Sequence, residues 1–284
     1  MKISVRVHDL GKGSAKDLAI KTKELGFDAV QLVLYKAIEG FKKEAHSTSY
    51  KDILSTASAF KENNIEITML GAYFNPVHSN KELVKDNIER FKEYISYCKD
   101  FNCKYVGSET GSYNDDKWTY NPLNRLDEAL NKDIKIFKEL AEVAKENNVS
   151  ITLEGAYGHC MYSPNQLNRL VTCIDNGHVK VTVDIFNYLD ISAYDKETQH
   201  KLLDDSIQYF KDKIVIYHLK DFVVDNENKK LKQIGLGDGL MDLEYIISKA
   251  KLETPNATLV FEGCPKDKME SSLKYIKGLL NKYK

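Results

Sequence analysis

Four short segments of this sequence each end on a side chain that can bind a hard metal ion. In segment 149–154 aliphatic residues alternate with small polar ones, so a strand here would carry Glu154 at the end of its polar face. The same design recurs in VKVTVD, IVIYH and TLVFE, which end on Asp184, His218 and Glu262. Because the four segments follow one another along the chain, their recurrence predicts one site built from neighbouring strand ends.

Three carboxylates and one imidazole make a set of mostly oxygen donors. Such a set suits one divalent ion, Mn²⁺ first, with Mg²⁺, Co²⁺ or Zn²⁺ as alternatives. Three negative charges at close range would repel one another strongly without a cation. A single glutamate at a strand end is more often a surface or helix-capping residue, and a single buried histidine is more often only hydrogen-bonded. Four such residues at corresponding strand ends indicate a metal site.

The elements that must position these residues alternate between strands and helices. Strand patterns cover 3–7, 28–34, 65–70, 104–109, 149–154, 179–184, 214–218 and 258–262. Helical patterns follow them at 14–25, 49–63, 81–101, 124–146, 164–175, 198–211, from 242, and at 268–281. This alternation predicts a parallel sheet, and eight such units suit an α/β fold, a (β/α)8 TIM barrel forming one domain over residues 1–284. A doubly wound open sheet competes, but it usually has fewer strands and needs a switch-point loop that we do not find.

Side-chain parity along the strand patterns agrees with a closed barrel. In the third pattern Ile67 and Met69 lie on one face and Thr68 on the other. A barrel strand places its aliphatic face against the helices and its other face inside. The same parity directs the four strand-end candidates inward at the C-terminal mouth of the barrel, where barrel enzymes keep their active sites.

The bulk composition excludes several classes of protein. A net charge of −1 and a pI of about 6.7 argue against a broad nucleic-acid surface. No apolar run approaches the roughly 20 residues needed to cross a bilayer, and the N-terminus lacks the apolar core of a signal peptide. The cysteines are odd in number and lack C-x-x-C spacing, which is typical of reduced thiols. We therefore expect a cytoplasmic protein without a membrane or nucleic-acid partner.

Longer motifs around the strand ends resemble a known family. They are Glu154 with His159, Asp184-Ile-Phe-Asn187, His218-Leu-Lys220-Asp221, Gly235-Leu-Gly-Asp-Gly-Leu-Met-Asp242 and Phe261-Glu262-Gly263. Earlier segments look like one subgroup of that family: Arg6-Val-His8-Asp9, Gln31-Leu-Val-Leu-Tyr-Lys36, Gly71-Ala-Tyr-Phe-Asn75-Pro76 and Glu109-Thr-Gly. The chain resembles, over nearly its whole length, the xylose isomerase-like TIM barrels. These are sugar and sugar-phosphate isomerases and epimerases, with endonuclease IV as a more distant relative.

The resemblance implies a mechanism and a set of roles. Ketose epimerases of the family bind one divalent ion through residues that match Glu154, Asp184, His218 and Glu262. The ion polarises the substrate carbonyl and so acidifies the neighbouring C–H. Two carboxylates then act as base and acid through an enediolate, and Glu154 and Glu262 match these catalytic positions. Barrels of this kind often form homo-oligomers, which the resemblance leaves open here.

The sequence also departs from the epimerase pattern. Those epimerases carry a histidine three residues after the strand-six aspartate and an arginine soon after the strand-seven histidine, where this chain has Asn187 and approximately Val224. Asn187 can still hydrogen-bond a hydroxyl group, whereas the missing arginine removes a usual substrate contact. The expected substrate-binding residues are therefore His159, Asn187, Lys220, His8 and Glu109.

Two weaker patterns lie in loops. The segment GLGDG at 235–239 superficially suggests a phosphate loop, with Lys230 and Lys232 nearby, but it does not match G-x-G-x-x-G and is better explained as a shaped loop before Asp242. Trp118 and the tyrosines beside it follow the fourth strand pattern, where they would either cover the mouth or form a protein–protein patch.

The sequence thus favours a metal-dependent isomerase or epimerase of a sugar or sugar phosphate. The first alternative is a dehydratase of the inosose or dehydroshikimate type, which would use one metal ion on the same scaffold. An endonuclease IV-like phosphodiesterase needs a three-zinc site rich in histidine. This chain has too few histidines near the mouth for such a site, and its net charge does not suit a nucleic-acid substrate. A barrel that binds a ligand without turnover would be favoured if the site held no metal.

Overall fold

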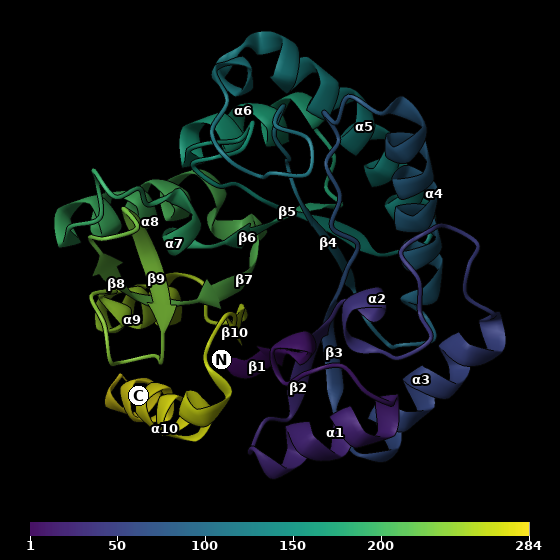
Figure 1. The fold of residues 1–284 in the computed structure, drawn as a ribbon, viewed down its shortest axis with the longest axis horizontal. Coiled ribbons are helices and arrows are strands. Elements are labelled where there is room, and N and C mark those ends of the chain that lie inside the picture. The colour runs from purple at the N-terminus through teal and green to yellow at the C-terminus, as the bar shows by residue number, and fades with distance from the viewer. Residues whose placement is uncertain (284) are drawn as a thin grey trace.

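Eight parallel strands close into a barrel in the computed structural model, which describes residues 1–283 (Figure 1). Around the barrel the strands follow the order β1-β10-β7-β6-β5-β4-β3-β2, so that the first strand pairs with the last. The barrel strands are β1 Lys2–Arg6, β2 Ala29–Leu32, β3 Glu66–Gly71, β4 Tyr105–Glu109, β5 Ser150–Glu154, β6 Val179–Val183, β7 Ile214–Leu219 and β10 Thr258–Phe261. The predicted (β/α)8 TIM barrel is confirmed.

Helices follow the strands and form the outer ring of the barrel (Figure 1). The long helices are α1 Ala15–Glu24, α3 Tyr50–Glu62, α4 Lys81–Tyr97, α5 Asp127–Glu146, α6 Pro164–Ile174, α8 Lys196–Phe210, α9 Leu243–Glu253 and α10 Met269–Lys282. Two single-turn helices, α2 Leu34–Ala37 and α7 Ile185–Tyr188, begin within two residues of strands β2 and β6. The sequence analysis missed both of them, because one turn is too short to show a helical period.

Side-chain caps explain where most long helices begin. Ser14, Ser49, Asn80, Ser163 and Asp195 each accept a hydrogen bond from the backbone N–H three residues further on. Such a cap satisfies one of the donors that a helix start leaves unpaired. The predicted helix over 124–146 is wrong at its start, since Leu126 is extended (φ −84°, ψ 148°) and separates a 3-10 turn from α5.

The main hydrophobic core lies between the barrel and its helices, and a smaller cluster of Met69, Ile216 and Val260 fills the barrel interior. The sequence analysis expected Met69 on the helix-facing side with Ile67. That expectation was wrong, because the pairing of β2 with β3 shifts register between Val30 and Gln31 and turns Met69 inward. A Cβ added at Gly107 would lie 2.2 Å from the Met69 sulfur, so a larger residue there would require the Met69 side chain to move.

An antiparallel hairpin stands outside the barrel sheet. It consists of β8 Asp221–Asp225 and β9 Lys230–Ile234, and it follows β7 directly (Figure 1). The sequence predicts no strand here, only a loop between the strand over 214–218 and the helix from 242. The tip of the hairpin is charged, and its two short strands bury little apolar area. The alternation of apolar and polar residues that would mark a strand is therefore weak there.

Candidate functional site

The four strand-end residues meet at the C-terminal mouth of the barrel. Glu154 is the last residue of β5, and His218 lies near the end of β7. Asp184 follows β6 and caps helix α7 by accepting the backbone N–H of Asn187, 3.1 Å away. Glu262 follows β10. We call these four residues the strand-end cluster.

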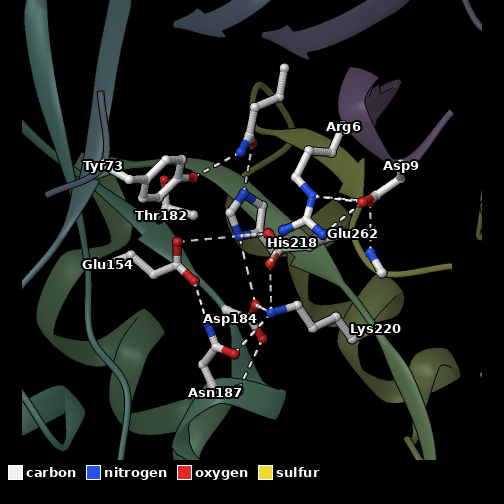
Figure 2. Close-up of polar contacts among 12 residues, drawn as sticks. Arg6, Asp9, Tyr73, Glu154, Thr182, Asp184, Asn187, His218, Lys220 and Glu262 are labelled. Atoms are coloured by element: carbon white, nitrogen blue, oxygen red, sulfur yellow. Dashed lines mark hydrogen bonds and ion pairs between the residues drawn. The ribbon is translucent and has the colours of Figure 1, made fainter. Parts of the chain in front are cut away.

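The imidazole of His218 lies at the centre of the strand-end cluster (Figure 2). Its Nδ1 atom is 3.3 Å from Glu154 Oε2, 3.6 Å from Asp184 Oδ2 and 2.9 Å from Glu262 Oε2. Burial works against a charged imidazole, but the carboxylates of Glu154 and Glu262 outweigh it and hold the pKa of His218 well above its ordinary value. Three carboxylates thus converge on one nitrogen.

The other ring nitrogen of His218 is held by two side chains behind it. His218 Nε2 lies 2.8 Å from Gln31 Oε1, and Gln31 Nε2 donates to the Tyr73 hydroxyl at 2.8 Å. Since an amide oxygen only accepts, Nε2 must carry the proton. When the imidazole is neutral, this arrangement leaves the Nδ1 lone pair directed at the three carboxylates.

The donor set fits a divalent metal ion. Glu154, Asp184 and His218 are buried and offer one ligand atom each within 4.8 Å of one another, and Glu262 is not part of that group. His218 Nδ1 and Asp184 Oδ2 are buried and make no hydrogen bond of good geometry among the described residues, although Glu262 and Lys220 lie 2.9 and 2.8 Å from them as ion-pair partners. Ligands about 2.1 Å from one ion lie roughly 3.0–3.5 Å apart. The separations around His218 Nδ1 match this spacing, so the buried Glu154–Asp184–His218 triad could hold the ion.

Glu262 is held from two further sides. Arg6 NH1 lies 2.6 Å and Lys220 Nζ 2.8 Å from Glu262 Oε1. Burial opposes ionisation of Glu262, but Lys220, His218 and Arg6 outweigh it and keep its pKa well below the ordinary range. Arg6 is itself fixed by Asp9, which also accepts the backbone N–H of Gly263 at 2.8 Å.

Two of the predicted substrate-binding residues, Lys220 and Asn187, contact the strand-end cluster directly. Lys220 Nζ is 2.8 Å from Asp184 Oδ2 and donates to Asn187 Oδ1 at 2.8 Å (Figure 2). Asn187 Nδ2 donates to Glu154 Oε1 at 2.6 Å. Asn187 and Lys220 therefore bridge Glu154, Asp184 and Glu262 from the side of β6 and β7.

The mouth contains two lobes that share Glu109 and Trp118. The larger, about 550 Å³, reaches the tip of the β8–β9 hairpin and includes His159, Asn187 and Lys230; we call it the hairpin lobe. The smaller, about 380 Å³, lies at the ends of β1 and β2; we call it the β2 lobe. Its lining includes Arg6, His8, Lys36, Tyr73, Glu154 and Glu262.

The remaining predicted substrate-binding residues line these lobes with shifted pKa values. Burial, with the charges of Glu154 and Glu262, raises the pKa of Glu109 to about 8, so this carboxyl holds its proton at neutral pH. Burial lowers the pKa of both His8 and His159 to about 3, so both imidazoles are neutral there. The structure thus places neutral hydrogen-bonding groups in both lobes.

The two weaker sequence patterns have structural explanations. The Asp221 carboxylate accepts backbone N–H bonds from Gly237, Gly239 and Met241 at 2.9–3.0 Å. These bonds use donors that a phosphate would need, which supports the reading of 235–239 as a shaped loop. Trp118 lines both lobes and packs edge-to-face on His159, with ring centroids 5.3 Å apart.

The supporting residues of this site fall in segments that carry the family resemblance, but the sequence predicted no role for them. Arg6 ends β1, Gln31 lies on β2 and Tyr73 follows β3. Arg6 contacts Glu262 and Gln31 contacts His218, both from distant parts of the chain, and Tyr73 holds Gln31. The available signal was Gln31, a polar residue inside an otherwise apolar strand pattern, which is fully buried here. A buried polar side chain in a strand needs a partner, and this one has two.

Comparisons with known proteins agree with this fold. The family model for the xylose isomerase-like TIM barrel matches residues 20–279, and the chain belongs to that family. A search of curated proteins by sequence found no match. No helix of residues 1–283 is long and apolar enough to cross a membrane.

Solved structures share the fold at low sequence identity. A D-tagatose 3-epimerase-like protein superposes with a TM-score of 0.77 at 20% identity, covering 100% of this chain and 98% of its own. An IolI protein with a bound zinc atom gives a TM-score of 0.74 at 18% identity, covering 100% and 99%. The probable 3-DHS dehydratase AsbF of Bacillus anthracis gives 0.73 at 16% identity, covering 98% and 99%.

Proposed function

We propose that this protein is a divalent-metal-dependent epimerase or isomerase of a sugar or sugar phosphate, acting by proton transfer next to a carbonyl group. The observation that carries the proposal is the pair Glu154 and Glu262. Their Oε2 atoms lie 3.3 and 2.9 Å from His218 Nδ1, and both side chains line the β2 lobe. Two carboxylates of one cavity, beside a set of metal-type donors, suit the removal and return of a carbon-bound proton.

The two carboxylates have environments that separate their roles. Burial raises the pKa of Glu154. Arg6 and Lys220 beside Glu262 keep that carboxylate ionised despite its burial. Groups whose pKa values are pushed apart can serve as acid and base in one reaction. A bound divalent ion would polarise the substrate carbonyl and acidify the neighbouring C–H.

Other residues of the chain would bind and orient the substrate. Trp118 and His159 line the mouth and would exclude water from the reacting carbon. Asn187 and Lys220 fix the carboxylates of Glu154 and Asp184 and lie within reach of a substrate hydroxyl. The neutral imidazoles of His8 and His159 can each donate and accept a hydrogen bond. The similarity to epimerase structures is consistent with this arrangement.

The test is exchange of carbon-bound hydrogen in D₂O, followed by NMR on Mn²⁺-loaded protein with a panel of ketoses and ketose phosphates. We expect deuterium to enter one carbon next to the carbonyl and an epimer or isomer to form. Glu154→Gln and Glu262→Gln should each lower exchange by at least about 100-fold. Glu24→Gln, an exposed helix position without a partner in the described chain, is the matched control. Absence of exchange for every substrate with metal bound would overturn the proposal.

A dehydratase is the second candidate, and Glu109 is the observation that favours it. A carboxyl that keeps its proton at neutral pH can protonate a leaving hydroxyl group, and Glu109 lines both lobes of the mouth. The similarity to a probable dehydratase structure is consistent with this chemistry. Loss of water would give an enone that absorbs in the ultraviolet, whereas epimerisation would not.

A further inference from the structure

The β2 lobe contains positive charge that the proposed reaction does not use. Arg6, Lys36 and Lys43 all line its volume of about 380 Å³. Arg6 is engaged by Asp9 and Glu262. Lys36 and Lys43 have no carboxylate within ion-pair distance among residues 1–283. Two unpaired ammonium groups therefore face the cavity in which the substrate would lie.

Lys36 is exposed, but it is the more informative of the two because its ammonium group lies beside a ring of the same lobe. It lies on the single-turn helix α2, with Nζ 5.9 Å from the centroid of the Tyr73 ring. Desolvation by the surrounding protein lowers the pKa of Lys36, and the nearby Arg6 charge lowers it further. An anion bound beside this ammonium group would offset the Arg6 charge and favour the charged form of Lys36.

Lys43 is exposed at the rim of the lobe. The backbone of its loop is held by a buried arginine side chain. Arg90 is almost fully buried and donates to the Lys43 carbonyl at 2.7 Å and to the Tyr73 carbonyl at 2.9 Å. Its guanidinium also stacks 5.1 Å from the Tyr35 ring centroid. Arg90 thus holds the loop that carries Lys43 against the residues that line the lobe, so the backbone from which this side chain extends is preorganised.

The β2 lobe opens directly onto the proposed reaction centre. Glu154 and Glu262 form part of the same lining as Lys36 and Lys43. Tyr73 connects the lysine side of the lobe with the reaction centre. Its ring packs under Lys36, and its hydroxyl accepts a hydrogen bond from Gln31, which in turn contacts His218. The carboxylates on the floor already have cationic or amide partners, as Glu262 contacts Arg6 and Lys220 and Glu154 contacts Asn187. The ammonium groups of Lys36 and Lys43 can therefore bind an anionic group of the ligand.

We propose that the β2 lobe binds an anionic terminal group of the substrate, a phosphate ester or a carboxylate, through Lys36 and Lys43. The substrate is then a ketose phosphate or a keto sugar acid and not a neutral ketose. Charge-assisted hydrogen bonds from ammonium groups are the usual means of holding such anions. That the carbonyl end of the substrate lies at Glu154 and Glu262 rests on the proposed function. Anion binding in the β2 lobe does not depend on it.

The hairpin lobe fits such an anion less well. Its lysines, Lys229 and Lys230, lie on the tip of the β8–β9 hairpin, and its lining contains neither Glu154 nor Glu262, so an anion held there would not share a lining with the proposed catalytic pair. Phe186, Leu189 and Ile191 give that lobe an apolar side. An uncharged part of the substrate would suit it better.

The test compares three ligands that share a six-carbon ketose skeleton: D-fructose 6-phosphate, 5-keto-D-gluconate and D-fructose. Binding to Mn²⁺-loaded protein is measured by calorimetry for the wild type, Lys36→Met, Lys36→Arg and Lys42→Met. Lys36→Met keeps the apolar stem of the side chain, and Lys42→Met removes one exposed charge from the same loop outside the lobe. We expect Lys36→Met to weaken binding of one or both anions roughly 10- to 100-fold. Lys36→Arg and Lys42→Met should bind them nearly as the wild type does.

The outcomes separate the two proposals. Binding of the phosphate alone or of the keto acid alone identifies the anion. D-fructose binding as tightly as both anions, with no loss in Lys36→Met, would overturn the anion site and leave the proposed reaction standing. Anion binding that depends on Lys36, without exchange of carbon-bound hydrogen in any ligand, would overturn the proposed reaction and leave the anion site. If Lys36→Met does not fold, Lys43→Met provides the same comparison.

Discussion

At the residue scale, the site depends on how one histidine is held. His218 Nδ1 faces three carboxylates because Nε2 is bound to Gln31, which is bound to Tyr73 in turn. Partners of this kind orient a metal-binding histidine and fix its tautomer. Gln31 comes from β2, on the far side of β1 and β10 from the strand that carries His218.

Replacing Gln31 with leucine tests that support. The leucine side chain keeps a similar size but removes the acceptor for His218 Nε2, so the imidazole can rotate or change tautomer. We expect the affinity for Mn²⁺ to fall roughly 10- to 100-fold, measured by competition with a chelator. Gln208→Leu, at an exposed position of α8, is the matched control. Unchanged Mn²⁺ affinity in Gln31→Leu would show that His218 does not need this partner.

Much of the site could be predicted from the sequence, because side chains alternate between the two faces of a strand. A strand with aliphatic residues on one face leaves only the other face for its terminal polar residue, so Glu154, Asp184 and His218 were correctly placed together. The supports could not be found in this way. The contact of Arg6 with Glu262 joins residues 256 positions apart in sequence and depends on β1 pairing with β10.

At the element scale, the sequence predicts the long helices and strands well and the short elements poorly. Helix α7 begins directly at the Asp184 cap, so a residue predicted as a strand end is also a helix start. The β8–β9 hairpin lies where no periodic apolar pattern marks it, yet its tip lines the hairpin lobe. Elements of one turn or a few exposed residues depend on tertiary contacts more than on local sequence.

Helix α5 contains a buried group that weakens the fold and gives a pH-dependent prediction. Asp133 is fully buried, and neither carboxylate oxygen has a hydrogen-bond partner in the described chain. Burial raises its pKa well above the ordinary value. The unfolded chain therefore releases this proton at lower pH than the folded protein does. Its contribution to stability is complete below about pH 4 and falls as the pH rises from there towards the folded-state pKa.

Asp133→Asn removes the ionisation while keeping the shape of the side chain. We expect the variant to be more stable than the wild type by about 1–3 kcal/mol at pH 8. The difference should vanish near pH 3.5, which chemical denaturation at several pH values would show. Asp212→Asn, at an exposed position, should show no such trend. Equal stability of Asp133→Asn and wild type at pH 8 would mean that the carboxylate of Asp133 has a compensating partner.

At the scale of the whole molecule, the strand-end cluster joins strands that are far apart in the sequence. Glu154, Asp184, His218 and Glu262 belong to or follow β5, β6, β7 and β10, which are consecutive neighbours in the closed barrel. Only the closed barrel brings their donors together, so the unfolded chain should bind the ion far more weakly. Metal binding and barrel stability are then linked.

This linkage predicts the effect of removing the metal. At a free Mn²⁺ concentration 100 times the dissociation constant, the ion should stabilise the folded protein by about 2.7 kcal/mol. For a chain of this size that corresponds to a rise in Tm of roughly 4–6 °C, which a chelator should reverse. Asp184→Asn should lose the rise, because it weakens one ligand of the buried triad, whereas Asp212→Asn should keep it. A Tm that does not change with Mn²⁺ in the wild type, at a concentration shown to bind, would mean that the ion binds the unfolded chain equally well. That result would place the ion outside the mouth of the closed barrel.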